Sequence, residues 1–513
     1  MNEKDRRQRL AVAEAAAMCN SGRMSRRKFI RLCAEAGFSL TSLYFLSSCK
    51  QEKPQVPDSK KIRLSSGPQS AIESASDQSH FLKEMGKKFP DTTLRVISED
   101  TPPSRAISQM LKDEFIALTG INVEWELLPL DRVLAKTAAD TARKTGMHDI
   151  FYWDQSWVSR FAEDSVNVRE LLENMDLAYP AYNFSDILPP LVENIASYKD
   201  RLVGIPFDIP IFIMMYRKDV FDELQLAVPT TMDQYLKTIK AIQSAKAPKM
   251  FGTTGQWKSG HYALECDMTA WLWSHGGSFF DNAGQPALKD GHAEAALNYM
   301  LELGRYMPPG VTTWAWSSQA ASFAQGLAGI YISWGEYFPS FDDPLQSKIV
   351  GLAEAAPCPK EVALRTKSEC GFGENPGISH QGGSCLAISR HSKNISAAWV
   401  LLQWATSADI TTRACILGGG SSPIRKSNYE DPRIIENKRI MSSTTRHLDV
   451  TLDAIVNRMG TEPHLPEWAN LTVDSFAVEL GKLTTGQQDV KSTLNNMSVA
   501  AEKVSARNTN RSA

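Results

Sequence analysis

Gly-Ile-Pro-Phe-Asp-Ile-Pro, at residues 204–210, is the stretch that decides the fold, and it leads through an apolar run at 211–215 into Tyr216-Arg217-Lys218-Asp219. A tight glycine–proline entry, one carboxylate at Asp208 and a charged exit are typical of a strand that crosses between two lobes. The same features also occur in an ordinary buried strand flanked by proline. The segments on either side therefore decide between the two interpretations.

The segment before this stretch alternates strands and helices. Its pattern predicts strands at 93–98, 121–126 and 149–152, with a helix between Ser104 and Gly120 and another from Asp131 to about residue 146. This order implies parallel pairing with right-handed crossovers, and ligands of such sheets bind beyond the carboxyl ends of the strands. Trp153 and Asp154 follow the third strand, so we expect them in its exit loop at that edge.

A second mixed segment follows the crossing. It contains predicted helices at 290–306 and 317–325, a buried strand at 326–334, a further strand at 385–388 and a largely helical C-terminal part. Residues 50–90 are polar and contain prolines, which predicts a tether with one helix at 71–88. The chain is thus predicted to form two α/β lobes that are joined at residues 204–219.

The composition is that of a soluble protein with room for two full-sized cores, since 42% of the 513 residues are hydrophobic and 22% are charged. Residues 1–48 hold nine Lys or Arg and four Asp or Glu of the totals of 56 and 58, which leaves 47 basic against 54 acidic residues, a net charge of −7. A mildly acidic body argues against nucleic acid as a partner, because phosphate binding depends on clustered Lys and Arg.

The N-terminus is predicted to be a targeting segment. Ser25-Arg26-Arg27-Lys28-Phe29-Ile30 is a twin-arginine motif, and the apolar run after it, at 32–46, is shorter than the roughly 20 residues that a spanning helix needs. The run ends in Leu46-Ser47-Ser48-Cys49, which resembles a bacterial lipoprotein box with Cys49 as the site of lipid attachment. We expect an exported, membrane-anchored lipoprotein of the periplasm or cell surface; a short membrane-anchor helix is the alternative.

Five cysteines remain outside the N-terminal segment: Cys266, Cys358, Cys370, Cys385 and Cys415. Cys358 and Cys370 flank a polar stretch and could close a hairpin, with buried free thiols as the alternative, so the pairing stays open. The sequence has no CxxC pair, and none of its nine histidines is spaced i,i+4 from another. No metal and no cofactor are therefore expected.

Motifs of catalysis are absent from the sequence, which has no GxSxG elbow, no GxxxxGK[ST] phosphate loop and no HExxH. Asp342-Asp343 could imitate the acid pair of a glycosidase. Adjacent Asp residues before Pro344 are more typical of a solvated turn. We therefore expect a binding protein rather than an enzyme.

Tryptophan placement points to a carbohydrate ligand. Trp271, Trp399 and Trp404 lie in predicted helices and are assigned to the core, whereas five others lie in or beside predicted loops: Trp153, Trp257, Trp314, Trp316 and Trp334. The flat face of a Trp can stack on a sugar ring while a neighbouring carboxylate accepts hydrogen bonds from its hydroxyls. The pairs Trp153–Asp154 and Trp334–Glu336 have that composition.

Six blocks in order along the chain resemble one family. They lie at 115–123, 149–151, 204–221, 276–281, 323–330 and 382–388, and include Gly276-Gly277-Ser278-Phe279-Phe280-Asp281. In these blocks the chain is similar to the extracellular solute-binding proteins (family 1) of ABC importers, the family of maltodextrin-binding protein. The resemblance implies an α/β, two-lobed periplasmic-binding-protein fold (type II-like), with an inter-lobe hinge of two or three crossings and a ligand cleft.

The same resemblance implies ligand-binding residues. Trp153 and Asp154 match a first-lobe loop that often holds sugar, Asp208 matches the inter-lobe segment, and the Trp334–Glu336 turn matches an aromatic contact of the second lobe. Gly383 and Ser384 match a glycine turn whose backbone amides face the cleft, while Trp257 and Trp314 are carried over from loop position only. Pro210 stands about where the maltodextrin-type pattern has an acidic residue, so the ligand is left open among oligosaccharides, monosaccharides, polyols and glycosides.

The predicted domains follow from this resemblance. They are a signal peptide at 1–48, a tether at 49–91, lobe I at 92–207 and 350–418, lobe II at 208–349 and 419–505, and a tail at 506–513. The expected function is that of a lipid-anchored, monomeric protein that binds a carbohydrate and delivers it to the transmembrane subunits of an ABC permease. The alternatives are an exported glycoside-acting or redox enzyme and a ligand sensor without transport.

Overall fold

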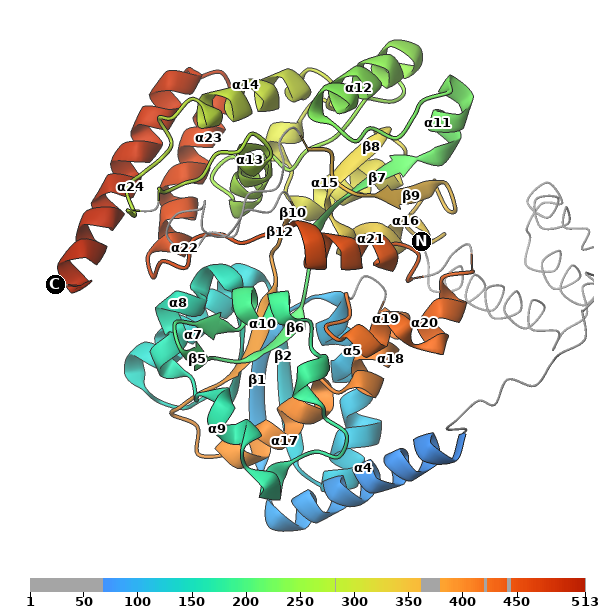
Figure 1. Ribbon diagram of the computed structural model, residues 1–513, viewed down its shortest axis with the longest axis vertical. Coiled ribbons are helices and arrows are strands. Elements are labelled where there is room, and N and C mark those ends of the chain that lie inside the picture. Colours follow the sequence, from blue (N-terminus) through green and yellow to red (C-terminus); the bar gives the residue numbers. More distant parts are fainter. Residues whose placement is uncertain (1–67, 282, 361–378, 419–421, 441–443, 513) are drawn as a thin grey trace, which may run out of the picture. The chain divides into compact units, whose positions relative to one another are not determined.

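The computed structural model of the chain describes residues 68–281, 283–360, 379–418, 422–440 and 444–512. The predicted signal peptide, Cys49, residues 49–67 of the tether and Cys370 lie outside these residues. Residues 68–513 form one compact unit, whose two main sheets are the centres of two lobes (Figure 1).

The first lobe is built on a five-stranded sheet in the order β2-β1-β3-β11-β6. Strands β1 (Thr93–Glu99), β2 (Asn122–Leu128) and β3 (Ile150–Asp154) are parallel, as the alternating pattern predicts. Strand β11 (Ser384–Ile388) lies antiparallel between β3 and β6 (Ile205–Asp208). A segment almost 180 residues downstream of β6 thus completes the middle of this sheet.

Helices cover both faces of the first sheet. Helix α5 (Pro102–Leu111) has Thr101 as its N-cap, three residues before the predicted N-cap Ser104. Proline is tolerated in the first turn, where the backbone N–H has no helical partner. The helix continues through a π-helical turn and α6 (Ala117–Thr119) to Gly120, whose φ of 71° ends the helix as predicted. The other elements of this lobe are α7 (Leu130–Arg143), α8 (Val158–Phe161), α9 (Val168–Leu172), α10 (Pro189–Ile195), β4 (Ser197–Tyr198), β5 (Arg201–Leu202), α17 (Ile395–Ala405), α18 (Ala408–Gly418), α19 (Lys426–Glu430) and α20 (Pro432–Asn437).

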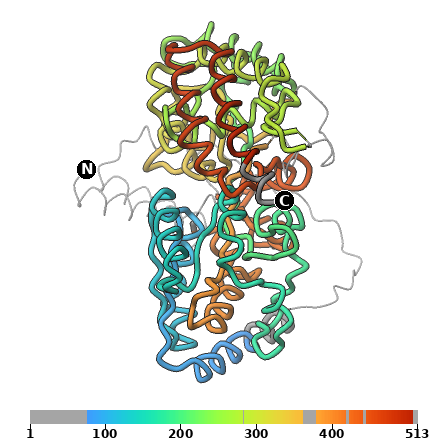
Figure 2. Tube along the Cα trace, turned by 90° about the vertical axis from the view of Figure 1, so that its left-hand side faces the viewer, coloured from blue at the N-terminus to red at the C-terminus, as the bar shows by residue number. Residues whose placement is uncertain are grey.

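The second lobe is built on a three-stranded antiparallel sheet in the order β8-β7-β9. Its strands are β7 (Phe212–Arg217), β8 (Ile330–Trp334) and β9 (Ala353–Ala356). Its helices are α11 (Lys218–Leu224), α12 (Met232–Lys246), α13 (Tyr262–Ser274), α14 (His292–Gly304), α15 (Trp316–Ala324), α16 (Phe338–Phe341), α22 (Trp468–Leu471), α23 (Ala477–Thr484) and α24 (Val490–Ser512). The C-terminal helices α23 and α24 pack against α13 and α14 (Figure 2).

Three segments connect the lobes. The first lies within residues 204–219: β6 belongs to the first sheet and β7 to the second, with residues 209–211 between them. The second returns through β10 (Ser379–His380) into β11, and it lies beside the first, since Gly382 N–H donates to the Pro210 carbonyl at 2.9 Å. The third passes through α21 (Leu448–Asp453) and β12 (Met459–Gly460), which pairs with β10. The predicted crossing at 204–219 is confirmed.

Two segments belong to the other lobe than the one to which the predicted domain borders assign them. The remaining borders stay a prediction. Strand β9 falls in the range assigned to lobe I but pairs with β7 of the second sheet. Helices α19 and α20 fall in the range assigned to lobe II but pack on α18 of the first lobe. Both are short elements whose partners are distant in sequence, so periodicity alone could not place them. Helix α24 also continues through the predicted tail to Ser512.

Trp153 is not in the exit loop that the sequence predicts. Strand β3 runs to Asp154, and the Trp153 ring is fully buried, stacked on Phe151 with 6.1 Å between ring centroids and tilted against Phe161 at 5.7 Å. Strand β3 is two residues longer at its end than the predicted strand at 149–152. Successive side chains of a strand point to opposite faces of the sheet, so Trp153 points into the core while Asp154 ends the strand at the edge. The predicted core tryptophans Trp271, Trp399 and Trp404 are buried as expected.

Helix α4 (Pro68–Lys88), which the sequence predicts within the tether, packs on the first lobe. Leu82 and Met85 are buried in its core, and Gly86 faces the end of α6 so closely that an added Cβ would lie 1.9 Å from the Thr119 carbonyl oxygen. We expect Gly86→Ala to lower the free energy of unfolding by about 1–3 kcal/mol, because backbone atoms must move apart. Urea denaturation of the full chain measures this loss. Lys83→Ala, an exposed change on the same helix, is the control, and equal stability of the two variants would contradict the packing of α4.

Candidate functional site

A cavity of ≈ 650 Å³ lies at the carboxyl ends of the central strands, lined by residues of both lobes. The first lobe contributes the segment after β1 from Glu99 to Arg105, Leu130 at the start of α7, and Asp154 at the end of β3. The second lobe contributes the turn after β8 and the first residues of α13 and α15. Pro210 and Gly382 of the connecting segments line it as well. This is the strand edge at which ligands of open α/β sheets bind.

Aromatic rings form part of the second-lobe wall. Trp334 ends β8, where its Nε1–H donates to Gln256 Oε1 at 3.2 Å and its ring packs edge-on against Phe212 at 4.5 Å. Gly382 leaves room for this ring, because a Cβ there would lie 3.2 Å from the Trp334 side chain. Trp316 and Tyr262, at the start of α15 and α13, also line the cavity. The wall thus offers flat apolar faces in fixed positions.

Carboxyl groups face the same space. Tyr152 O–H lies 3.2 Å from Asp208 Oδ2 and 3.3 Å from Glu99 Oε2, which brings the ends of β1, β3 and β6 together. Burial raises the pKa of Glu99 to about 8, and the negative charges of Asp208 and Asp154 add to the rise. Burial also raises the pKa of Asp208 to about 6.

Two further carboxyl groups reach the cavity from opposite lobes. Burial raises the pKa of Asp154 to about 7, although hydrogen bonds from the Ser156 hydroxyl and backbone N–H to Asp154 Oδ1 lower it. Burial likewise raises the pKa of Glu336 well above its usual range. The negative charges of Asp208 and Glu99 raise it further. The four groups therefore repel one another when ionised, across the space between the lobes.

The structure brings together only part of the predicted ligand-binding set. Asp154, Trp334 and Glu336 line the cavity; Asp208 lies behind its wall, bonded to Tyr152. Trp153 and Trp257 are buried away from it, Trp257 against Gly304, and Trp314 is partly buried in the second-lobe core. The role of each in binding stays a prediction.

The glycine turn differs by one residue from the one that the resemblance implies. Gly382 lines the cavity, while the Gly383 N–H donates to the Gln381 side chain at 2.6 Å, so this amide does not face the cavity. Ser384 is buried at the start of β11, where it pairs in register with Asp154 and Asp208. Asp342, expected in a solvated turn, is buried and paired with Arg446 at 2.8 Å.

Sequence reasoning did not single out Tyr262 as a cavity residue. Glu99 was expected at the strand edge where ligands bind, and Trp316 beside a loop, but neither was included among the predicted ligand-binding residues. Tyr262 and Trp316 stand at helix N-termini, where neither periodicity nor composition distinguishes a ring that faces a cavity from one that packs on a neighbour.

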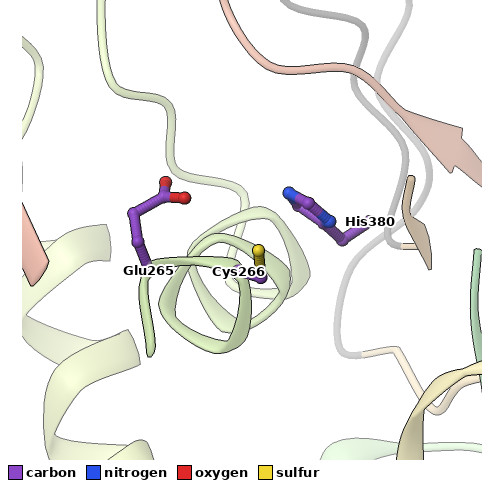
Figure 3. Close-up of side chains that lie close together, drawn as sticks. All are labelled: Glu265, Cys266 and His380. Carbon is purple, nitrogen blue, oxygen red and sulfur yellow. The ribbon is translucent and has the colours of Figure 1, made fainter. Parts of the chain in front are cut away.

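Glu265, Cys266 and His380 form the one group in the described part of the chain whose side chains could hold a metal, with ligand atoms within 4.8 Å of one another (Figure 3). All three are buried, and two have local partners: Thr269 donates to Glu265 at 2.6 Å, and His380 Nε2 lies 2.8 Å from Glu462 Oε1. Burial raises the pKa of the Cys266 thiol well above its usual range, so the thiolate that a metal needs is disfavoured. The expectation of no metal stays a prediction.

Comparison with known proteins identifies the family. The family of bacterial extracellular solute-binding proteins matches residues 110–441. The chain belongs to this family, which confirms the resemblance seen in the six sequence blocks. None of the helices described here is both long and apolar enough to cross a bilayer.

Three relatives illustrate the range of the family. A probable amino-acid ABC transporter periplasmic-binding protein of Sinorhizobium fredii is 22% identical over 361 residues, 68% of this chain and 76% of that protein. The mannitol-binding protein of Pseudomonas aeruginosa is 24% identical over 293 residues, 56% of this chain and 62% of its own length. The crystal structure of an ABC transporter solute-binding protein of Agrobacterium radiobacter in complex with ribitol has a TM-score of 0.69 at 26% identity, covering 81% of this chain and 99% of that one. The two-lobed fold is confirmed, and two of these three proteins are named as parts of ABC transporters.

Proposed function

We propose that this protein is the substrate-binding component of an ABC importer and that its cavity binds a sugar, oligosaccharide or polyol. The observation that carries the proposal is the combination of fixed aromatic faces at Trp334 and Trp316 with the carboxyl groups of Glu99, Asp154 and Glu336 around one cavity. Aromatic faces suit the C–H surface of a carbohydrate, and carboxylates accept hydrogen bonds from its hydroxyls. Relatives named for mannitol and ribitol agree with this choice.

An amino acid, suggested by one relative's name, fits the cavity less well. The α-carboxylate of an amino acid needs a cationic partner, and Arg105 is the one Lys, Arg or His among the lining residues that the structure describes. Its guanidinium is already paired with Asp100 at 2.6 Å. The remaining acidic wall would repel a carboxylate.

Transport would proceed by closure and not by catalysis. A ligand that contacts Asp154 on the first lobe and Trp334 or Glu336 on the second favours the conformation in which both sets of contacts are made, which is a population shift. The closed form then presents the ligand to the permease. The twin-arginine motif and the lipoprotein box ending at Cys49 support export and a lipid anchor that holds the protein beside that permease.

A thermal-shift screen of sugars, alditols, glycosides and amino acids on the purified protein tests the proposal. We expect at least one sugar or alditol to raise the melting temperature in a concentration-dependent way and to be recovered unchanged, since a ligand at 100 times its Kd adds about 2.7 kcal/mol to the stability of the native state. A shift with amino acids alone would overturn the carbohydrate assignment. Recovery of a cleaved glycoside would favour the enzyme alternative.

A further inference from the structure

The walls of the cavity carry a large excess of carboxyl groups over basic groups. Its described lining contains six carboxyl groups and one guanidinium: Glu99, Asp100, Asp154, Glu336, Asp342, Asp343 and Arg105. Two carboxyl groups are neutralised locally, Asp100 by Arg105 and Asp342 by Arg446. The inner groups Glu99, Asp154 and Glu336 have no basic side chain within ion-pair distance in the part of the chain that is described.

The inner carboxyl groups also keep hydrogen-bonding capacity. Asp154 is 3% exposed and lines the cavity, yet only its Oδ1 is used, by Ser156. Oε2 of Glu336 and Oδ1 of the 1% exposed Asp208 accept no hydrogen bond from the described residues. A buried acceptor without a partner is costly, so the free oxygens of Asp154 and Glu336, which line the cavity, favour a ligand that donates to them.

A neutral carbohydrate would satisfy the free hydrogen-bond acceptors but would not compensate the excess of carboxyl groups. Its hydroxyls can donate hydrogen bonds, but they bring no positive charge to compensate the ionised forms of Glu336, Glu99 and Asp208, which repel one another. A protonated amine donates hydrogen bonds and also compensates the charge on both sides of the cavity. It would therefore add to the affinity and favour closure of the lobes.

A bound metal ion fits the geometry less well than an organic cation. A hard cation such as Ca²⁺ takes several oxygen ligands at 2.3–2.6 Å, so its carboxylates must converge on one point. Among the described residues, no three cavity carboxyl groups bring ligand atoms within 4.8 Å of one another. The charges are spread around a space of ≈ 650 Å³, which suits an extended ligand.

We propose that the ligand of this cavity is an amino sugar or an aminated polyol, whose ammonium group lies between the carboxyl groups of Glu336 and those of Glu99 and Asp154. This inference rests on the proposed carbohydrate-binding function and narrows its ligand class. Asp208, held by Tyr152 behind the wall, adds to the field that attracts the ammonium group.

Proton release gives the inference a second readout. The pKa of Glu99 is raised to about 8 and that of Asp154 to about 7, so both groups are partly protonated at neutral pH before binding. An ammonium group favours their ionised forms, so binding should expel protons. Affinity for D-glucamine, whose ammonium group stays protonated over this range, should rise from pH 5 to pH 8. The other charged groups facing them, the Asp100–Arg105 pair, Asp208 and Glu462, also bear on this slope.

Matched pairs of probes test the inference by calorimetry at pH 7: D-glucitol with D-glucamine, D-glucose with D-glucosamine, and D-galactose with D-galactosamine, with CaCl₂ as a separate probe. For at least one pair we expect the amine to bind about tenfold more tightly than its neutral partner, with proton release and with a loss of the preference at high salt. Glu336→Gln should bring the affinity ratio of that pair toward one. Glu124→Gln, an exposed charge change on β2, should leave the ratio unchanged.

The outcomes separate this inference from the function on which it rests. If neutral carbohydrates bind as tightly as their amines, the inference is overturned and the proposed function stands. Competition of Ca²⁺ with a bound carbohydrate would overturn it in favour of a metal ion. If no probe of the panel binds while amino acids do, both proposals fail.

Discussion

Replacing Glu462 with alanine is expected to lower the free energy of unfolding by about 3–5 kcal/mol, the largest stability loss we expect of a single substitution in this protein. Glu462 is completely buried just after β12. Its Oε2 accepts hydrogen bonds from Gln155, Tyr262 and Trp468, each at 2.7 Å, and its Oε1 lies 2.8 Å from His380 Nε2. The alanine variant would leave these four donors without their acceptor in a site that water does not reach.

The pKa of Glu462 agrees with this role. Burial alone would raise it, but the hydrogen bond and charge of His380, together with Tyr262 and Trp468, hold it below its ordinary value. A carboxyl group whose pKa is lower in the folded protein stabilises the fold above its unfolded pKa, and that contribution is lost as the pH falls through the folded value. The variant should therefore lose stability at pH 7 and differ less from the parent protein under strongly acidic conditions.

Equilibrium urea denaturation followed by tryptophan fluorescence measures the effect. Glu462→Gln keeps one acceptor and the shape of the side chain, so its loss should be smaller than that of alanine. Glu502→Gln, which removes an exposed ion pair with Lys289, should change the stability by no more than about 0.5 kcal/mol. An alanine variant as stable as the Glu502 control would contradict the buried network.

Asp154→Asn is expected to weaken carbohydrate binding by about 10–150-fold while leaving the fold intact. The substitution removes the charge that faces the cavity but keeps an oxygen that can accept from Ser156, as Asp154 Oδ1 does. A hydrogen bond to a charged group contributes about 1.5–3 kcal/mol, and each 1.4 kcal/mol corresponds to a factor of ten in Kd. Calorimetry with the carbohydrate that gives the largest thermal shift measures the change.

Stability as a function of pH separates lost binding from damaged folding. Because the pKa of Asp154 is raised to about 7 in the folded protein, this carboxyl group lowers stability as the pH rises from about 4 through 7. The Asn variant should therefore be at least as stable as the parent at pH 8. Asp113→Ala, an exposed change on the first lobe, is the binding control. Unchanged affinity of Asp154→Asn would remove Asp154 from the site.

The sequence predicts the plan of the fold because hydrophobic periodicity is a local signal. The strands β1 and β3, the stop at Gly120 and the crossing at 204–219 follow from residues close together in the chain. The partners of β9 and β11 do not, because each of these short strands pairs with a segment distant in sequence. Their place is decided by the packing of the whole lobe.

The candidate site was harder to predict for a related reason. Asp154 could be placed at the sheet edge, but two extra residues of β3 turn its neighbour Trp153 into the core. Trp257 likewise packs against Gly304 in the second lobe. A loop position in sequence therefore does not establish that a ring is free to meet a ligand, since tertiary contacts bury most large aromatic side chains.

Strand β11 has a consequence for how the polypeptide is made. It occupies an inner position between β3 and β6, yet it is translated only after most of the second lobe. The N-terminal lobe thus cannot close its sheet while the ribosome is still producing residues before Ile388, and contacts of such long sequence separation form slowly. A nascent chain stalled at residue 350 would leave the edges of β3 and β6 unpaired, so the first lobe is not an independent folding unit.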